Sequence, residues 1–146
     1  MRLPTLVVSV LLVTLTAGCS GDPQADYCEA VESHQVALSD VAASDDPGAL
    51  FDALDAYDDL AEQAPSDIAD DWAAVVGPLH HLQDVLDEHD VDASTYSAEK
   101  PPAGLDADAR RDIEAAAREV GSERTVTAMA AVEQHALDVC GTPLSR

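Results

Sequence analysis

The segment 66–89, SDIADDWAAVVGPLHHLQDVLDEH, carries the most regular apolar pattern in this chain. Its large apolar residues recur at intervals of three, four, three and four positions: Trp72, Val75, Leu79, Leu82 and Leu86. Because an α-helix turns once in about 3.6 residues, this spacing puts all of these side chains on one helical face. The segment therefore predicts a helix that has Ser66 as its cap, ends near His89 and continues as a single kinked helix through Pro78.

Three further stretches have helical apolar spacing, and no stretch has the alternation of a strand. The first follows Asp22-Pro23 and the second follows Asp46-Pro47, where aspartate suits the helix cap and proline the first helical position. The third spans residues 106–140, and its apolar face changes direction at Gly121-Ser122, so this helix is either bent or split near Gly121. The prediction is an all-α, up-and-down four-helix bundle with a long loop over residues 91–105.

The N-terminus has the layout of a bacterial lipoprotein signal peptide. Arg2 precedes an apolar run, and the small residues of Leu15-Thr16-Ala17-Gly18-Cys19 lead into a cysteine. The apolar run is too short for a transmembrane helix, which needs about 20 apolar residues. We expect a signal peptide over residues 1–18, a lipid on Cys19, a lipidated tether over residues 19–25 and a helical bundle domain over residues 26–146. Secretion with full release is the alternative, because Thr16 stands where an aliphatic residue is more usual.

Two cysteines remain once Cys19 carries a lipid. Cys28 and Cys140 form an even pair in an exported protein, which predicts a disulfide, with two free thiols as the alternative. Their wide separation does not suit a cysteine-based metal site. The disulfide would bring the start of the first helix to the end of the last, which requires an even number of crossings in an up-and-down bundle. Residues 106–140 should therefore make one net crossing.

The charge balance limits the partners of this protein. The chain has 29 Asp and Glu against 7 Lys and Arg, a formal net charge of −22. Such a field repels nucleic acid and anionic lipid headgroups, so we expect no nucleic-acid partner. Cationic partners are favoured only in a general sense, because dense surface aspartate also serves solubility. The expected partners are the cell membrane, reached on its extracytoplasmic face through the lipid, and an envelope protein or a small apolar ligand.

Residues that could bind a metal are present without a complete motif. The chain has five histidines: His34, His80, His81, His89 and His135. Helical spacing puts His34 nearest a core face and His135 mostly on the outer side of its segment. His80 lies one turn from Asp84, but two ligands do not define a metal site. Residues 90–94 and 106–108 imitate part of a calcium loop and do not complete it. We therefore predict no metal site.

Catalytic patterns are equally incomplete. The chain has no Gly-rich phosphate loop and no nucleophile motif, and its serines stand in no recognisable triad order with histidine. Acidic residues are so frequent that no single carboxylate pair stands out as a general acid and base. We therefore predict no catalytic residues, no cofactor and no enzyme activity.

Several short motifs of the mature region carry a resemblance: Tyr27-Cys28, Leu60-Ala61, Ala64-Pro65, Asp70-Asp71-Trp72 and Val139-Cys140-Gly141. With them the chain resembles small uncharacterised actinobacterial lipoproteins. The resemblance implies an α-helical extracytoplasmic domain with Cys28 and Cys140 paired and no assigned activity.

The predicted anchor, the braced bundle and the many acidic residues leave two functional hypotheses. The protein is a membrane-tethered binding or accessory module of the cell envelope, acting through residues 91–105 or a groove beside Pro78, or it binds divalent cations with clustered surface carboxylates.

Overall fold

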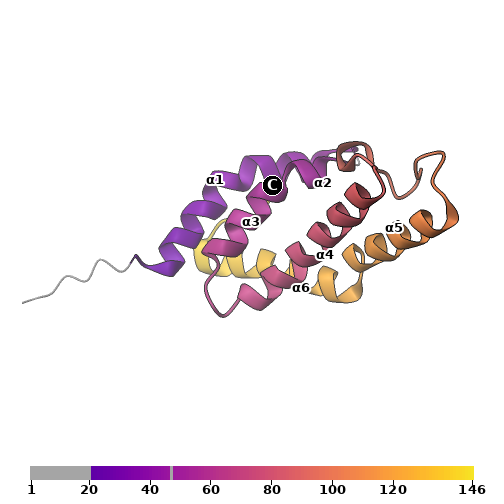
Figure 1. Cartoon of the computed structure of the whole chain (residues 1–146). Helices are drawn as coiled ribbons and strands as arrows, with labels where there is room; N and C mark the ends of the chain where they lie inside the picture. Colours follow the sequence, from indigo (N-terminus) through magenta and orange to yellow (C-terminus); the bar gives the residue numbers. More distant parts are fainter. Residues whose placement is uncertain (1–20, 47) are drawn as a thin grey trace, which may run out of the picture.

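The computed structural model describes residues 21–46 and 48–146, and these residues form helices and connecting segments without any strand (Figure 1). The α-helices are α1 Pro23–Ala43, α2 Ala49–Asp52, α3 Leu54–Gln63, α4 Ala69–Glu88, α5 Ala107–Val120 and α6 Glu123–His135. A 3₁₀ turn, η1, covers Ala93–Thr95, and a π-helical turn, η2, covers Ala136–Cys140. The prediction of an all-α domain is confirmed. The proposed signal peptide over residues 1–18 and the lipidation site Cys19 lie outside the described residues.

The predicted helix starts differ in how well they match the structure. Asp22 caps α1 by accepting a hydrogen bond from the Gln24 amide at 3.1 Å, and Pro23 fills the first position, as expected. The prediction that Ser66 caps the long central helix is wrong, because α4 begins at Ala69 after the uncapped Ile68. A turn over residues 65–68 takes the place of the expected first helical turn, in which the Ile68 amide donates to the Pro65 carbonyl at 3.0 Å.

The second predicted helix is divided into α2 and α3. Asp46 accepts a hydrogen bond from the Gly48 amide at 2.9 Å, so it caps a turn that precedes the helix rather than the helix itself. The four residues of α2 end at Asp52, and the backbone of Ala53 leaves the helical conformation before α3 begins. The division turns Phe51 toward a different part of the core from its neighbour Leu50.

The structure decides how the helices pass Pro78 and Gly121. Pro78 lies inside α4, which runs through it as one helix, so the prediction of a single helix is confirmed. The alternatives for residues 106–140 are decided in favour of a split, since α5 ends at Val120 and α6 begins at Glu123. Ser122 caps α6 by accepting a hydrogen bond from the Thr125 amide at 3.2 Å. Both α5 and α6 pack against α4.

The buried apolar residues form two clusters. The disulfide-end cluster gathers side chains from α1, α3, the first half of α4, α6 and the C-terminal tail, among them Val31, Leu60, Trp72, Val132 and Leu144. The α5 cluster gathers side chains from the second half of α4, the segment after it and α5: Leu82, Leu86, Val91, Tyr96, Ile113 and Ala116. Val120 packs against both clusters. The molecule is accordingly elongated, with α5 at the opposite end from the start of α1 (Figure 1).

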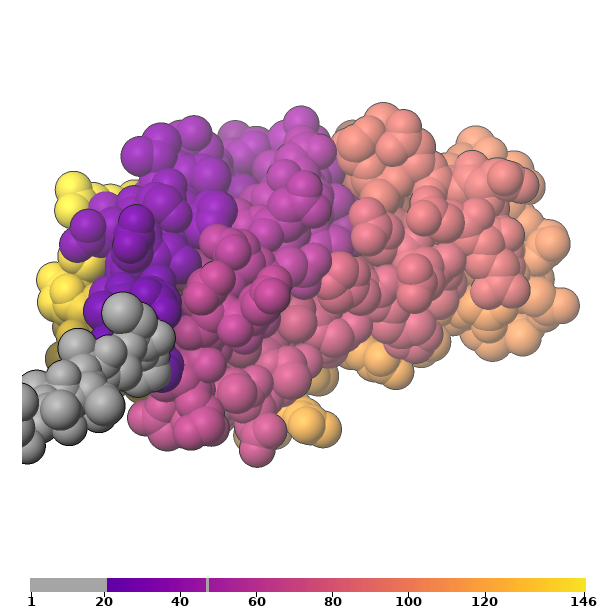
Figure 2. Space-filling view, turned by 60° about the vertical axis from the view of Figure 1, so that its left-hand side comes forward, coloured from indigo at the N-terminus to yellow at the C-terminus, as the bar shows by residue number. Residues whose placement is uncertain are grey.

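The predicted disulfide is present between Cys28 and Cys140, with an S–S distance of 2.01 Å and a Cα–Cα distance of 5.3 Å. The chain that follows Cys140 lies back against α1, where Gln35 donates a hydrogen bond to the Pro143 carbonyl. The Arg146 amide donates to the Ser39 hydroxyl at 2.9 Å. Leu144, which lies between Pro143 and Arg146 in the sequence, is buried. The first helix and the C-terminal residues therefore occupy the same end of the molecule (Figure 2).

None of the helices in the described part of the chain is long and apolar enough to span a membrane.

Candidate functional site

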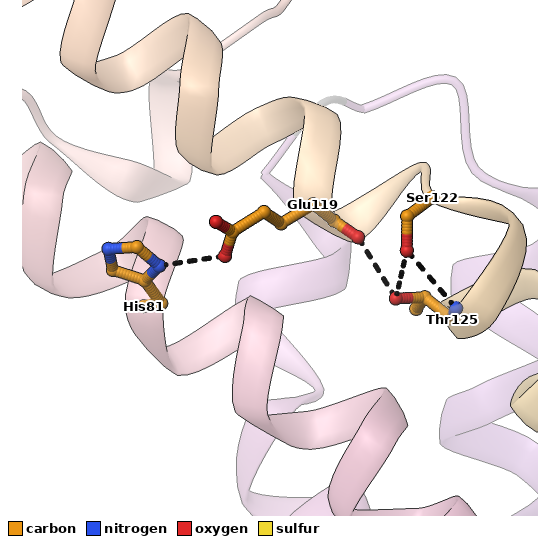
Figure 3. Close-up of polar contacts among 4 residues, drawn as sticks. All are labelled: His81, Glu119, Ser122 and Thr125. Carbon is orange, nitrogen blue, oxygen red and sulfur yellow. Dashed lines mark hydrogen bonds and ion pairs between the residues drawn. The ribbon is translucent and has the colours of Figure 1, made fainter.

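The short turn between α5 and α6 brings together a small network of polar groups (Figure 3). The Thr125 hydroxyl donates to the carbonyl of Glu119 at 2.9 Å and lies 3.0 Å from the Ser122 hydroxyl. Thr125 is buried, with 8% of its surface exposed. These bonds satisfy backbone groups that the end of α5 and the start of α6 leave free, so the network fixes the geometry of the junction.

The same junction holds a histidine and a carboxylate without forming a catalytic triad. His81 Nδ1 lies 3.0 Å from the Glu119 carboxylate, and both side chains are more than half exposed. Figure 3 shows that the hydrogen bonds to Ser122 come from Thr125 and not from His81. A serine nucleophile needs a base within hydrogen-bond reach of its hydroxyl, and the hydrogen bonds of the described residues supply none here. The arrangement therefore gives no support to catalysis by Ser122.

One side of the junction opens into an apolar groove of about 210 Å³. Its lining side chains come from α2, α3, α4, α5 and α6: Leu50, Tyr57, Val75, Leu79, Val120, Thr125, Val126 and Met129. Thr125 and the Tyr57 hydroxyl are the polar members of this set. Val126 is 60% exposed beside the buried side chains of Tyr57, Val75 and Leu79. The groove is therefore an apolar surface that the fold leaves uncovered.

The other side of the junction is a more polar hollow of about 280 Å³. It is lined by Ala73, Ala74, Pro78, Glu119, Ser122, Arg124 and Thr125. Proline has no amide hydrogen, so Pro78 cannot donate to the Ala74 carbonyl as a helical residue would. Helix α4 is thus weakened opposite the break between α5 and α6, and both hollows lie beside this position. The expectation of a groove beside Pro78 agrees with this geometry.

Tyr57 is the titratable group of the apolar groove. Burial raises the pKa of Tyr57 above its ordinary value of 10.0, and the Glu133 carboxylate raises it further. Burial also raises the pKa of Tyr27, against a smaller lowering by its hydrogen bond with Trp72, and the pKa of Tyr96 is raised by burial and by Glu114. All three tyrosines of the chain therefore favour the neutral phenol in the folded state.

We expect the free energy of unfolding to fall as the pH rises above 10. The unfolded tyrosines ionise near 10.0 while the folded ones stay protonated to higher pH, so the stabilisation is complete below pH 10 and is lost as the pH passes the folded pKa values. Denaturant titrations between about pH 9 and about pH 11.5, followed beside phenolate absorbance, measure this. Tyr57→Phe should lose less stability over the same interval. Native phenols that titrate at 10.0 with no loss of stability would contradict the prediction.

Each of the five histidines lies against a carboxylate from another part of the fold. The pairs are His34–Asp59 at 2.7 Å, His80–Asp58 at 2.7 Å, His81–Glu119 at 3.0 Å, His89–Asp112 at 3.6 Å and His135–Asp67 at 3.5 Å. The half-buried position expected for His34 is confirmed. The expectation for His135 is wrong, because its side chain is only 13% exposed and its ring stands edge-on to Tyr27. The histidines thus connect separate segments of the fold.

Two carboxylates of the calcium-loop-like segments accept hydrogen bonds from nearby residues of the chain. Asp92 accepts hydrogen bonds from the Ser94 amide and hydroxyl, and Asp106 accepts from the amides of Asp108 and Ala109. These bonds hold the pKa of both carboxyl groups below their ordinary value of 3.8. Within residues 21–46 and 48–146, no three side chains of His, Cys, Asp or Glu gather as a metal site would require.

The expected working loop, residues 91–105, is more firmly packed than its sequence indicates. Val91 and Tyr96 are buried in the α5 cluster, and η1 forms between them. Gly48 approaches this turn so closely that a Cβ atom on it would fall 1.9 Å from the Ser94 carbonyl oxygen. Asp92, Ser94 and Thr95 stay exposed around these buried side chains. We take the groove at the helix junction as the better candidate for binding, because its lining is mainly apolar.

Comparisons with known proteins add nothing to this geometry, since no protein family, curated protein or solved structure matches the chain.

Proposed function

We propose that this protein is a lipid-anchored helical binding module of the cell envelope, and that its apolar groove takes one small apolar group of a ligand. The observation that carries the proposal is the groove at the α5–α6 junction, where Val126 stays 60% exposed beside a continuous apolar wall. A ligand group that covers Val126 and the side chains beside it removes apolar surface from water, which is favourable. Binding, rather than catalysis, fits a site with so few polar groups.

The size of the groove limits the ligand. Apolar cavities of about 150 Å³ accept a ligand the size of benzene, whereas pockets for drug-sized molecules measure about 300 Å³ or more. A groove of about 210 Å³ lies between these values. It therefore suits a single aromatic ring system or a short acyl segment. Covering an exposed side chain of this kind contributes roughly 1.5–3 kcal/mol, so the affinity should be modest.

A fluorescent titration tests the groove directly. The neutral probe N-phenyl-1-naphthylamine should bind the intact chain with a rise in fluorescence, because one of its two ring systems leaves water for the apolar wall. Val126→Asp places a carboxylate in the groove, and we expect it to weaken binding about tenfold or more, since an isolated charge resists burial. The matched control is Val36→Asp, because Val36 is 72% exposed on α1 and does not line the groove. Equal binding by both variants would overturn the proposal.

The membrane anchor belongs to the same proposal. The sequence supports cleavage before Cys19 and lipid attachment to its thiol, which would hold the domain on the extracytoplasmic face of the membrane. Labelled palmitate should be incorporated into the wild-type chain and not into Cys19→Ala, which should leave the membrane fraction. A Cys19→Ala protein that remained membrane-bound would contradict the anchor.

We propose, finally, that the domain is an up-and-down bundle with four crossings, in which α5 and α6 share the last one. Two observations support this topology. Helix α4 contacts both α5 and α6, and the Cys28–Cys140 disulfide returns the chain to the first turns of α1.

A further inference from the structure

Helix α3 packs against both α1 and α4, and one histidine from each of these helices reaches it (Figure 1). The Asp59 carboxylate lies 2.7 Å from Nε2 of His34 on α1. The adjacent Asp58 carboxylate lies 2.7 Å from Nε2 of His80 on α4. Two neighbouring carboxylates of one helix therefore contact two different helices. We call these two contacts, His34–Asp59 and His80–Asp58, the α3 pairs.

The charges of α3 oppose the stability of this helix. Each of its four carboxylates has a second carboxylate three residues away and a third one four residues away: Asp55, Asp58, Asp59 and Glu62. Like charges at these intervals repel each other on a helix surface. The helix has only 10 residues, no side-chain cap at its start and no basic residue in its last turn. An isolated helix of this length is marginal in water, so α3 depends on its contacts with α1 and α4.

Histidines are the only cations that the fold brings to these carboxylates. Residues 21–99, which include α1 to α4, contain no lysine or arginine. In the part of the chain that the structure describes, every ion pair between separate segments uses a histidine, since the Arg111–Asp108 pair lies within α5. Imidazole ordinarily gains its proton near about pH 6.5, whereas carboxyl groups stay ionised above about pH 5. The charge that offsets the repulsion within α3 therefore depends on pH.

The surroundings of His34 are mainly acidic. A hollow between α1 and α3 is lined by three carboxylates: Asp26, Glu29 and Asp59. The other segments on α1 are η2, whose Asp138 accepts a hydrogen bond from Gln134 at 2.8 Å, and the C-terminal tail. In the tail, the backbone amide of Arg146 bonds Ser39, more than one helical turn beyond His34. A positive charge on His34 therefore interacts chiefly with carboxylates.

The elements on the other sides of α4 leave Asp58 as the charged group in contact with His80. The carboxylates of α5 that reach α4 contact other histidines: His81–Glu119 and His89–Asp112. Two charged residues at the start of α6 line a hollow at the start of α4: Glu123 and Arg124. Glu133 of α6 lies near Tyr57, and η1 has no charged residue. The arginines of α5 are exposed: Arg110, Arg111 and Arg118.

We infer that the α3 pairs form a pH-sensitive device, in which protonation of His34 and His80 holds α3 against α1 and α4. A histidine that gains a carboxylate partner on folding stabilises the fold at low pH, and this stabilisation is lost as the pH rises and the proton leaves. Above about pH 7.5 both imidazoles are neutral, and the repulsion within α3 is no longer offset. The paired side chains are 27–44% exposed, so water screens each pair and its contribution is modest. The α3 pairs do not depend on the proposed binding function.

Hydrogen exchange of the α3 amides in the full oxidised chain tests this device. Their protection factors, corrected for the intrinsic effect of pH on exchange, should be about threefold or more higher at about pH 5.5 than at about pH 8. Asp58→Asn combined with Asp59→Asn removes both carboxylates of the α3 pairs. His34→Gln combined with His80→Gln keeps an amide donor at each position and removes the titrating group. Both double variants should lose most of the pH dependence.

The matched control is Asp55→Asn combined with Glu62→Gln. It removes the same amount of charge from the same helix, but both side chains are exposed and neither belongs to a histidine pair of the described residues. We expect this control to keep most of the pH dependence. Wild-type protection factors that are equal at the two pH values would overturn the inference. So would a pH dependence that persists in both paired variants, or one that the control loses to the same extent.

Discussion

Replacing both Cys28 and Cys140 with serine should lower the free energy of unfolding by about 4–5 kcal/mol. The disulfide joins residues 112 positions apart, and in the chain-entropy model a loop of that length restricts the unfolded chain by about this amount. The whole stability of a domain this size is only about 5–15 kcal/mol, so the variant should unfold at much lower denaturant concentration. Equilibrium unfolding followed by circular dichroism measures the difference.

The control for this experiment is Cys19→Ser, which keeps the disulfide and removes the remaining thiol. Reduction of this control should reproduce the loss seen in the double variant, because both act on the same bond. The contacts of Pro143 and Arg146 with α1 should weaken as well, since they depend on the position of the chain after Cys140. An unfolding free energy within about 1 kcal/mol of the control would contradict the entropic role.

The long helices and the disulfide could be predicted because they follow from the spacing of apolar residues and from the number of cysteines. The spacing from Trp72 to Leu86 defined the central helix through Pro78, and the change of face at Gly121 marked the later break. The cysteine count defined the disulfide. The division at Ala53 had no such signal, since alanine favours a helix and the break is imposed by packing of Leu50 and Phe51 on different clusters.

The candidate site could be predicted only in part, because its walls come from several helices that are distant in the sequence. Pro78 indicated where helix packing would open, and Gly121 where the last helix would bend or split. The groove walls also include Leu50 and Tyr57 from other helices, whose approach no local pattern describes. Val126 and Met129 stand three residues apart, so helical geometry puts them on one face of the last segment. That spacing alone does not indicate that Val126 stays largely exposed in α6.

Trp72→Ala should destabilise the domain by about 3–5 kcal/mol, the range found for truncating a large buried aromatic side chain. Trp72 is fully buried between α1 and α3, donates a hydrogen bond from Nε1 to the Tyr27 hydroxyl at 3.1 Å, and lies 6.3 Å from the ring of Tyr57. Its loss removes contacts to both helices at once and leaves the Tyr27 hydroxyl without this donor. Unfolding followed by circular dichroism measures the change, because the substitution removes the only tryptophan.

Trp72→Phe separates the two causes of this loss. It keeps an aromatic ring in the core and removes the indole donor, so it should cost about 1–2 kcal/mol, well below the alanine variant. A cycle with Tyr27→Phe isolates the hydrogen bond, since the two substitutions should be less than additive if the Nε1–hydroxyl contact stabilises the fold. A Trp72→Ala protein destabilised by less than about 1 kcal/mol would mean that α1, α3 and α4 are held together elsewhere. The disulfide at the same end of the bundle would then be the dominant constraint on α1.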